Sequence, residues 1–487
     1  MKIWNASGYV PFELEILTPV HIGSGADFSP LEYVIQETGQ GRHEVWLIDT
    51  AAWLAASAED PRVARALDAG DMASLRSLLN GCASLAAFVL GRVPIASASL
   101  ARLLLQKRNT VDSKAEIMAF ARNPFTHSPY IPASSLKGAI STALTDYLNN
   151  ERRGAGKPGL RQAQSAGEYR KIMEDMYGRI GEHSMQGLRM ADIALGPGMT
   201  SVREATGEDL EPPKRLEKTP CETLEPRASG KVFGNLRLAL CRGKPAVELR
   251  YGEAVSAEKL GRICNDFYRK RFQAELEKFY GRQHLQAVGE ALRPVAGRIA
   301  ALAEESEILL RVGRYSHYEC VTVSGAPEPH PVKGPGLSRT LADHALPFGW
   351  IILRRCSLEK YQQGIAAVDA ALREDIGQRA RIGREARERQ EEAERRAQAE
   401  AEAARKREEE LASLSPRERE IWELEQPDAI ENQASAIYAK LAEYGELMPR
   451  AAEALMRFWQ RAGKWEGKQL TKKQKEKVAA VRAILKI

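Results

Sequence analysis

The sequence lacks paired cysteines, long apolar runs and a strong excess of one charge, and each absence narrows the class of protein. Its six cysteines are scattered without a CxxC pair, which argues against a zinc ribbon and against a disulfide scaffold. No run approaches the roughly 18 apolar residues of a membrane helix, and the opening MKIWNASGYVPF has no apolar signal core. We therefore expect a cytoplasmic protein without a membrane segment.

The composition that remains is that of a globular protein with a mild basic balance. The chain has 487 residues, of which 44% are hydrophobic, and this length and content suit two or three domains with real cores. Its 71 lysines and arginines exceed its 65 acidic residues by only a little, giving a formal charge of +6. This charge permits nucleic-acid binding, but only a clustered basic patch would indicate it.

Two segments carry the clearest chemical pattern. Leu17–Gly25 (LTPVHIGSG) places a glycine turn after ELEIL, whose alternation predicts a half-buried strand. Tyr130–Leu144 (YIPASSLKGAISTAL) predicts an extended stretch and then a helix, where Ser134 and Ser135 offer N-cap hydroxyls. Helix N–H groups, these hydroxyls and the ammonium of Lys137 could hold a phosphate. A plain capped helix explains the second segment equally well.

Together the two segments resemble the signature of the RAMP superfamily of CRISPR-associated RNA-binding proteins, which consists of a strand, HIG, and later IPGSSLKG. Within that superfamily the chain is similar to the type III-A (Csm) effector-complex subunit that caps the backbone at the crRNA 3′ end, the fifth Csm protein. The resemblance covers roughly residues 9–356. It is carried in the right order by four further segments: FSPLEYVI, LRMADIAL, LLRVGRYSHYECVTV and LPFGWIIL.

The resemblance implies a ferredoxin-like (RRM-derived) RAMP core with helical insertions, and the mixed order of strands and helices by itself favours an α+β architecture. We expect the RAMP domain over residues 1–360, with insertions at 51–128 and 196–226, the second of them a long loop. Oppositely charged residues four apart predict a solvated helical linker over 361–414. An all-α C-terminal module is expected over 415–487.

Local periodicity predicts the remaining elements. Helices are expected over residues 51–58, 60–69, 72–79, 85–90, 135–151, 256–280 and 284–302, and a new helix begins at Ser415-Pro416. Strands are expected over residues 11–17, 31–36, 44–48, 231–241, 246–251, 307–312, 318–323 and 349–354, with 231–241 and 246–251 forming a hairpin.

A protein that holds a guide RNA of variable sequence must grip the ribose-phosphate backbone, which is the same at every position. Glycine turns, hydroxyls and cations suit that task. The candidate RNA-binding residues are Gly23, Ser24 and Gly25; Ser134, Ser135, Lys137 and Gly138; Arg314; and Lys333, Gly334, Gly336 and Arg339. The resemblance implies that the last group is the crRNA-binding glycine-rich loop, although its glycine spacing is unusual and a surface turn fits locally as well. The tyrosines beside Arg314 suit either base stacking or core packing.

Three other residues carry side chains that could act in catalysis. His21 is expected to be a structural histidine, because it stands between two apolar residues and has no evident acid–base partner. Asp27 follows HIG, as the catalytic aspartate of related backbone subunits does, but in different surroundings. Asp192 is expected to cap or support the fold. We therefore expect no catalytic residue and no metal.

The segment IPASSLKG departs from the family pattern at two positions. Ala133 stands where glycine is usual, and Ser141 stands where an arginine is common, which removes a cation from the expected RNA face. The lysines near the C-terminus, such as Lys472 and Lys473, are expected to form a solvated helix face rather than a binding site.

The leading hypothesis is a non-catalytic crRNA-binding subunit that caps the backbone of a type III-A CRISPR interference complex in antiviral defence, without a cofactor. The resemblance implies that it supports crRNA 3′-end maturation. Its partners would be crRNA, the neighbouring Csm backbone subunit, the small helical subunit and trimming nucleases. The alternative is a RAMP-type endoribonuclease that cleaves pre-crRNA through His21 or target RNA through Asp27. A third hypothesis is a helical adaptor whose C-terminal tail dominates.

Overall fold

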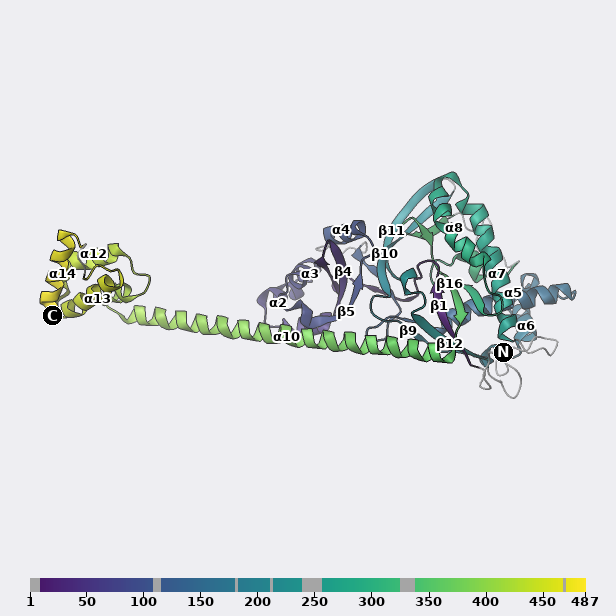
Figure 1. The fold of residues 1–487 in the computed structure, drawn as a ribbon, viewed down its shortest axis with the longest axis horizontal. Coiled ribbons are helices and arrows are strands. Elements are labelled where there is room, and N and C mark those ends of the chain that lie inside the picture. The colour runs from purple at the N-terminus through teal and green to yellow at the C-terminus, as the bar shows by residue number, and fades with distance from the viewer. Residues whose placement is uncertain are drawn as a thin grey trace. The chain divides into compact units, whose positions relative to one another are not determined.

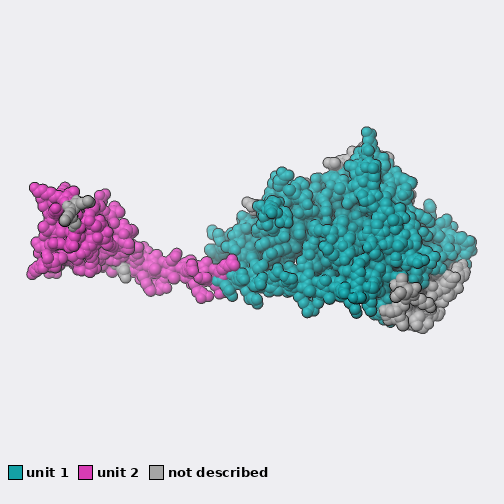
Figure 2. Space-filling view, in the orientation of Figure 1, with its two compact units in different colours: residues 1–388 teal, residues 389–487 magenta. Residues whose placement is uncertain are grey.

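The structure is a computed structural model that describes residues 9–107, 115–179, 183–210, 213–238, 256–324, 338–466 and 470–487. The chain forms two compact units, Met1–Glu388 and Arg389–Ile487 (Figure 2). The division falls inside the segment for which we predicted a charged helical linker. The mixed α+β architecture is confirmed.

A central antiparallel sheet organises the first unit (Figure 1). On strand β1, Phe12, Leu14 and Ile16 alternate into the main core, as the ELEIL pattern predicted. The strand order is β13–β16–β1–β12–β8. The bounds are β13 (Glu307–Arg311), β16 (Trp350–Arg355), β1 (Tyr9–Ile16), β12 (Val232–Leu238) and β8 (Leu188–Met190).

Two long helices, α5 (Ala133–Gly154) and α7 (Ala257–Glu275), cover one face of this sheet. Buried Leu136 and Ile140 on α5 share the main core with the strands, and the Tyr268 hydroxyl on α7 donates to the Ala139 carbonyl at 3.0 Å. Both predicted helices are confirmed, as is the helix predicted over 284–302. Helix α7 continues into a π-helical turn (Leu276–Tyr280). A 3-10 turn (Gln283–Leu285) and α8 (Gln286–Ala300) come next in the chain.

The first turns of helix α10 (Leu358–Ser413) lie over the other face of the sheet. Lys360 pairs with Glu13 at 2.7 Å, and the Asn235 amide donates to the Tyr361 hydroxyl at 2.8 Å. Gly364 lies so close to the ring of Phe233 that an added methyl group would collide with it. The first turns of α10 therefore cover β1 and β12 on this face of the sheet.

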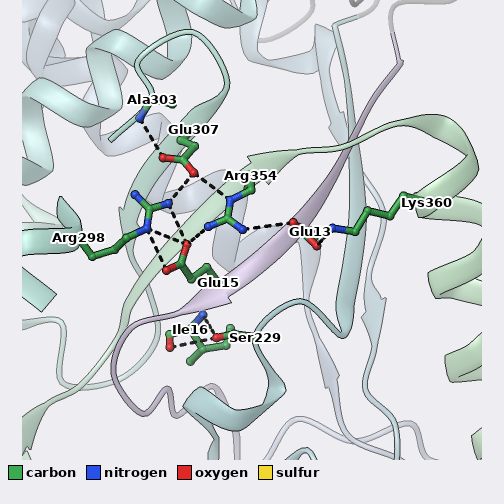
Figure 3. A network of polar contacts seen from close by, with 9 residues as sticks. All are labelled: Glu13, Glu15, Ile16, Ser229, Arg298, Ala303, Glu307, Arg354 and Lys360. Carbon is green, nitrogen blue, oxygen red and sulfur yellow. Dashed lines mark hydrogen bonds and ion pairs between the residues drawn. The ribbon is translucent and has the colours of Figure 1, made fainter. Parts of the chain in front are cut away.

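A network of ion pairs joins the adjacent strands β13, β16 and β1 (Figure 3). Arg298 contacts Glu15 at 2.9 Å and Glu307 at 2.5 Å, and Arg354 contacts Glu307 at 2.9 Å and also pairs with Glu15. Burial raises the pKa of Glu307, but hydrogen bonds from Arg298, the Ala303 amide and Arg354 outweigh it, so the pKa lies below its ordinary value.

This network predicts acid sensitivity. A carboxyl whose pKa is depressed by folding stabilises the protein above its unfolded pKa, and this stability is lost as the pH falls through the folded pKa. We expect the melting temperature to drop between about pH 5 and about pH 3. The drop should be smaller in Glu307→Gln, because glutamine does not titrate. Equal pH dependence of the two proteins in thermal melts would contradict this role of Glu307.

The second sheet has the order β15–β14–β10–β11–β6–β2. Its bounds are β15 (Leu346–Pro347), β14 (Ser338–Ala342), β10 (Thr200–Leu210), β11 (Pro213–Leu224), β6 (Ile117–Phe120) and β2 (Gly23–Phe28). The long loop predicted over 196–226 is therefore wrong, because β10 and β11 form a long antiparallel pair there. The segment misleads because its inward side chains are polar: Glu222 and Glu225 are buried, and Arg203 contacts Glu225 at 2.7 Å.

Between β2 and β6 the chain builds a smaller layer of a three-stranded sheet and short helices. The helices predicted over 51–58, 60–69 and 72–79 are confirmed, whereas residues 85–90 form a 3-10 turn (Leu85–Phe88) that leads into a strand. The elements are β3 (Tyr33–Gly39), β4 (Arg42–Ile48), α1 (Thr50–Ala56), α2 (Pro61–Asp68), α3 (Met72–Asn80), β5 (Val89–Pro94) and α4 (Ala98–Gln106).

The strand predicted over 318–323 is also wrong, since the chain forms helix α9 (His317–Val321) there. The Arg271 guanidinium donates to the carbonyls of Glu319 and Thr322, and it satisfies these groups without a neighbouring strand. The remaining elements of this unit are β7 (Tyr130–Ile131), which pairs with β9 (Ile193–Ala194), a 3-10 turn (Leu160–Gln162), α6 (Ala166–Tyr177), and 3-10 turns at Ser184–Gly187 and Pro226–Ala228. The predicted strand at 246–251 lies outside the described residues.

The second unit contains the C-terminal part of α10 and a small helical cluster. Exposed pairs such as Glu392–Arg396, at 2.6 Å, line α10, in agreement with the predicted solvated helix. A separate core gathers around Trp459 and Leu455. Its elements are α11 (Pro416–Glu425), which begins as predicted, α12 (Glu431–Ala439), a 3-10 segment (Leu441–Leu447), α13 (Met448–Arg461) and α14 (Lys472–Leu485). In the described part of the chain, no helix is long and apolar enough to span a membrane, and the five cysteines there are free.

Candidate nucleic-acid interface

His21 anchors the HIGSG loop inside the protein. It is buried, its Nδ1 lies 2.7 Å from the Glu222 carbonyl oxygen, and its ring meets Phe120 edge-on. Burial lowers the pKa of the imidazole, although the contact with Glu222 opposes this effect. A neutral histidine with one ring nitrogen bound to the backbone is a positioning residue for the loop.

The glycine turn that follows is presented to solvent on an edge strand. Gly23, Ser24 and Gly25 are exposed on β2, which borders β6 on one side only. The register of this pair breaks between Gly23 and Asp27, and Gly25 has a φ of +87°, which favours glycine. The backbone of this irregular edge is exposed, and its binding to RNA stays a prediction.

Arg314 is brought to the same loop by a close backbone contact. The Arg314 amide donates to the His21 carbonyl at 2.8 Å, and its exposed guanidinium lies over the Tyr315 ring at 5.6 Å. Gly313 precedes it with a φ of +83°, and an added methyl group there would collide with the His21 carbonyl. Only glycine suits this position, so the position of Arg314 beside HIGSG depends on it.

The start of helix α5 corrects one prediction. Ser134 and Ser135 are not N-cap residues, because the helix already begins at Ala133 and its N-cap is Pro132. The cap is supplied from elsewhere: the Ala133 amide donates to Asp192 Oδ1 at 2.7 Å. This carboxylate takes one of the N–H groups expected to hold a phosphate, so the helix terminus is a weaker anion cradle than predicted. Asp192 has the predicted capping role.

Cations nevertheless gather beside this helix start. Burial and the neighbouring charge of Arg189 lower the pKa of the Lys137 ammonium. Burial also lowers the pKa of His183, and the charge of Lys137 adds to this effect. Arg189 is exposed on β8 opposite Arg237 on β12. Arg189 is not among the predicted site residues. The sequence signal for it is its place between the apolar residues Leu188 and Met190, because side chains alternate between the two faces of a strand.

The two signature segments lie on either side of the residues that follow β6. The Ala121 amide donates to the Ile22 carbonyl at 2.8 Å, and the Tyr130 amide donates to the Ala121 carbonyl at 2.9 Å. Two strand spacings of about 4.8 Å therefore separate the HIGSG loop from the segment that leads into α5. Ala121 thus joins the HIGSG loop to the segment that leads into α5, although these segments are far apart in the sequence.

The third predicted segment, residues 333–339, is described only from residue 338 onward. Lys333, Gly334 and Gly336 lie outside the described residues. Arg339 is described and is 1% exposed, and its contact with RNA stays a prediction. Its guanidinium pairs with Glu275 and Glu319, each at 2.8 Å, and lies over the Phe279 ring.

No metal-binding group of three or more His, Cys, Asp or Glu residues occurs among the described residues. The fold is that of a mixed α+β protein in which Arg314 lies beside an exposed glycine turn. The family model of the RAMP superfamily matches residues 13–280, and the chain belongs to that superfamily.

Solved structures with related folds were found at low sequence identity. One is a chain of the cryo-EM structure of a Csm–crRNA–target RNA ternary complex of a type III-A CRISPR-Cas system, at 17% identity and a TM-score of 0.48, covering 71% of this chain and 99% of that chain. Another is the crystal structure of T. onnurineus Csm5, at 16% identity and a TM-score of 0.46, covering 70% and 99%. No curated protein matches the chain. The family assignment rests on the family model.

Proposed function

We propose that this protein is a non-catalytic subunit of a type III-A CRISPR interference complex that holds crRNA by its backbone. The observation that carries the proposal is that the residues after β6 hold the two RAMP signature segments on either side of them, with Arg314 bonded to the HIGSG loop and Lys137 on α5. Cations and backbone amides contact phosphates, which are the same at every position of a variable guide.

The arrangement of the central sheet supports a ferredoxin-like core. The chain order β1–α5–β8–β12–α7–β16 is a βαββαβ sequence, with β13 added at the edge next to β16. In space, β16 and β12 flank β1, and every described pair in this sheet is antiparallel. Because α10 covers β1 and β12 on the face of the sheet opposite α5 and α7, RNA would follow the loops and helix starts at the rim of the sheet.

The resemblance of FSPLEYVI, LRMADIAL and LPFGWIIL to the subunit at the crRNA 3′ side supports a backbone-capping role. In that role the protein would contact the neighbouring Csm backbone subunit and present the crRNA 3′ end to trimming nucleases. The helices after residue 415 would be free to contact the small helical subunit.

The competing function is an endoribonuclease. A general base must reach the 2′-hydroxyl that it deprotonates, and His21 is buried with its Nδ1 bound to a carbonyl. Asp27 is exposed on β2, so it remains the catalytic candidate to test. We expect the protein to leave repeat RNA and target RNA uncut with and without Mg²⁺. Specific cleavage that disappears in Asp27→Ala or His21→Ala would overturn the non-catalytic assignment.

The binding role predicts a salt-dependent loss in the variant Lys137→Ala/Arg314→Ala. Each phosphate contact on a single strand contributes about 0.7 to the slope of log affinity against log salt, so the slope should fall by about 1.4. The measurement is fluorescence anisotropy with single-stranded crRNA at several salt concentrations. The matched control, Lys472→Ala/Lys473→Ala, removes the same charge from α14 and should leave the slope unchanged. An unchanged slope in the first variant would place the RNA elsewhere.

A further inference from the structure

We infer that a cavity between α7, its π-helical continuation and α9 is a second binding site for phosphates of the same RNA, an assignment that rests on the proposed function. The cavity has a volume of about 480 Å³. Six cationic side chains and only two acidic ones line it: Arg161, Lys270, Arg271, Lys278, Arg311 and Arg339, against Glu275 and Glu319.

The two acidic residues of this cavity form ion pairs with its buried arginines. Arg311 and Arg339 each contact Glu275 at 2.8 Å, and Arg339 also pairs with Glu319. Arg271 is held by the carbonyls described above and lies 3.7 Å from Asp146. These groups form the charged wall of the cavity and are not released for a ligand.

Three other cations, the rim cations, line the cavity without an ion pair of this kind in the described part of the chain. Arg161, Lys270 and Lys278 are exposed, and none of them has a carboxylate partner in the described part of the chain. They project from two separate elements, the 3-10 turn before α6 and the helical run of α7. Unpaired cations that share one concave site raise its positive potential and favour an anion between them.

The walls offer the hydrogen-bonding groups that a sugar-phosphate strand uses. Thr322 and Ser324 line the cavity. An adjoining cavity of about 600 Å³ shares Arg161 and Thr322 with it and adds Ser141 and the exposed ring of Tyr169. Hydroxyls, cations and an aromatic ring along a groove are the features by which single-stranded RNA is held without regard to sequence.

Helix α5 connects this groove with the surface at HIGSG. Lys137, Ser141 and Thr145 follow one another at intervals of four residues and therefore lie along one face of the helix. The rise from Lys137 to Thr145 is about 12 Å. Ser141 and Thr145 line the adjoining cavity, so one RNA strand can contact Lys137 and continue to the rim cations.

The test compares the full chain with the variant Arg161→Ala/Lys270→Ala/Lys278→Ala. We expect the salt slope of single-stranded RNA binding to fall by about 2, since three contacts of about 0.7 each are lost. The affinity at moderate salt should fall at least tenfold. The charge-matched control Lys472→Ala/Lys473→Ala/Lys475→Ala, whose side chains are exposed on α14, should bind as the wild type does.

The outcomes separate this site from the proposed function. If the wild type binds RNA and the cavity variant keeps its affinity and slope, the cavity site is wrong and the function stands. If the wild type binds no RNA, the function itself fails. A cavity variant that binds RNA normally but no longer copurifies with Csm subunits would show that the cavity receives an acidic protein surface, which overturns the RNA assignment.

Discussion

Replacing Glu275 with alanine is expected to destabilise the first unit by about 3–5 kcal/mol, because it leaves buried charges without a partner. The guanidiniums of Arg311 and Arg339 are each 2% exposed and each contact this carboxylate at 2.8 Å. The pair also joins distant parts of the fold, since Arg311 ends β13 and Arg339 begins β14. Losing the carboxylate removes the group that holds these segments against α7.

Chemical denaturation followed by tryptophan fluorescence measures this effect, because Trp350 is buried with the Arg311 guanidinium 5.0 Å from its ring. The control is Glu277→Ala, an exposed acid in the following π-helical turn, which should change stability by no more than about 0.5 kcal/mol. Similar unfolding midpoints for the two variants would mean that the buried arginines find other partners and that Glu275 is dispensable.

The fold could be predicted wherever the chain shows a strong apolar period. ELEIL and the apolar face of α5 identify the central strand and its covering helix, since burial follows the period directly. The hairpin of β10 and β11 could not be predicted in this way. Its buried positions carry Thr200 and Glu222, and the burial of these polar groups is compensated by partners that no local pattern reveals, such as Arg122 for Glu222.

Local sequence patterns also reveal only part of the candidate site. Lys137 and the glycine turn are readable from the sequence, because their chemistry is local. The capping of Ala133 by Asp192 is not, since it depends on the pairing of β7 with β9. The cavity is built by residues from separated parts of the chain, among them Arg161, Lys270, Glu319 and Arg339, and no local pattern brings them together. Arg161, one of the cations of the cavity, lines the same groove as Ser141. Ser141 stands where the family pattern commonly has an arginine.

Gly313→Ala is expected to have the second large effect, on stability and on RNA binding together. A φ of +83° costs an L-residue about 1–2 kcal/mol, and the collision of the new methyl group with the His21 carbonyl adds about 1–3 kcal/mol of overpacking. The chain can relieve the collision only by separating Arg314 from His21, which breaks their 2.8 Å hydrogen bond. The HIGSG turn and the Arg314 guanidinium would then lose their relative position.

Gly297→Ala is the matched control. Gly297 lies inside α8, and an added methyl group there meets nothing within 4 Å, so this change should stabilise the protein by about 0.5–1 kcal/mol. Thermal melts and RNA affinity at a temperature where both variants are folded separate the two effects. We expect the folded Gly313→Ala protein to bind RNA more weakly than Gly297→Ala. Equal affinity would mean that the contact between His21 and Arg314 stabilises the fold without positioning the RNA surface.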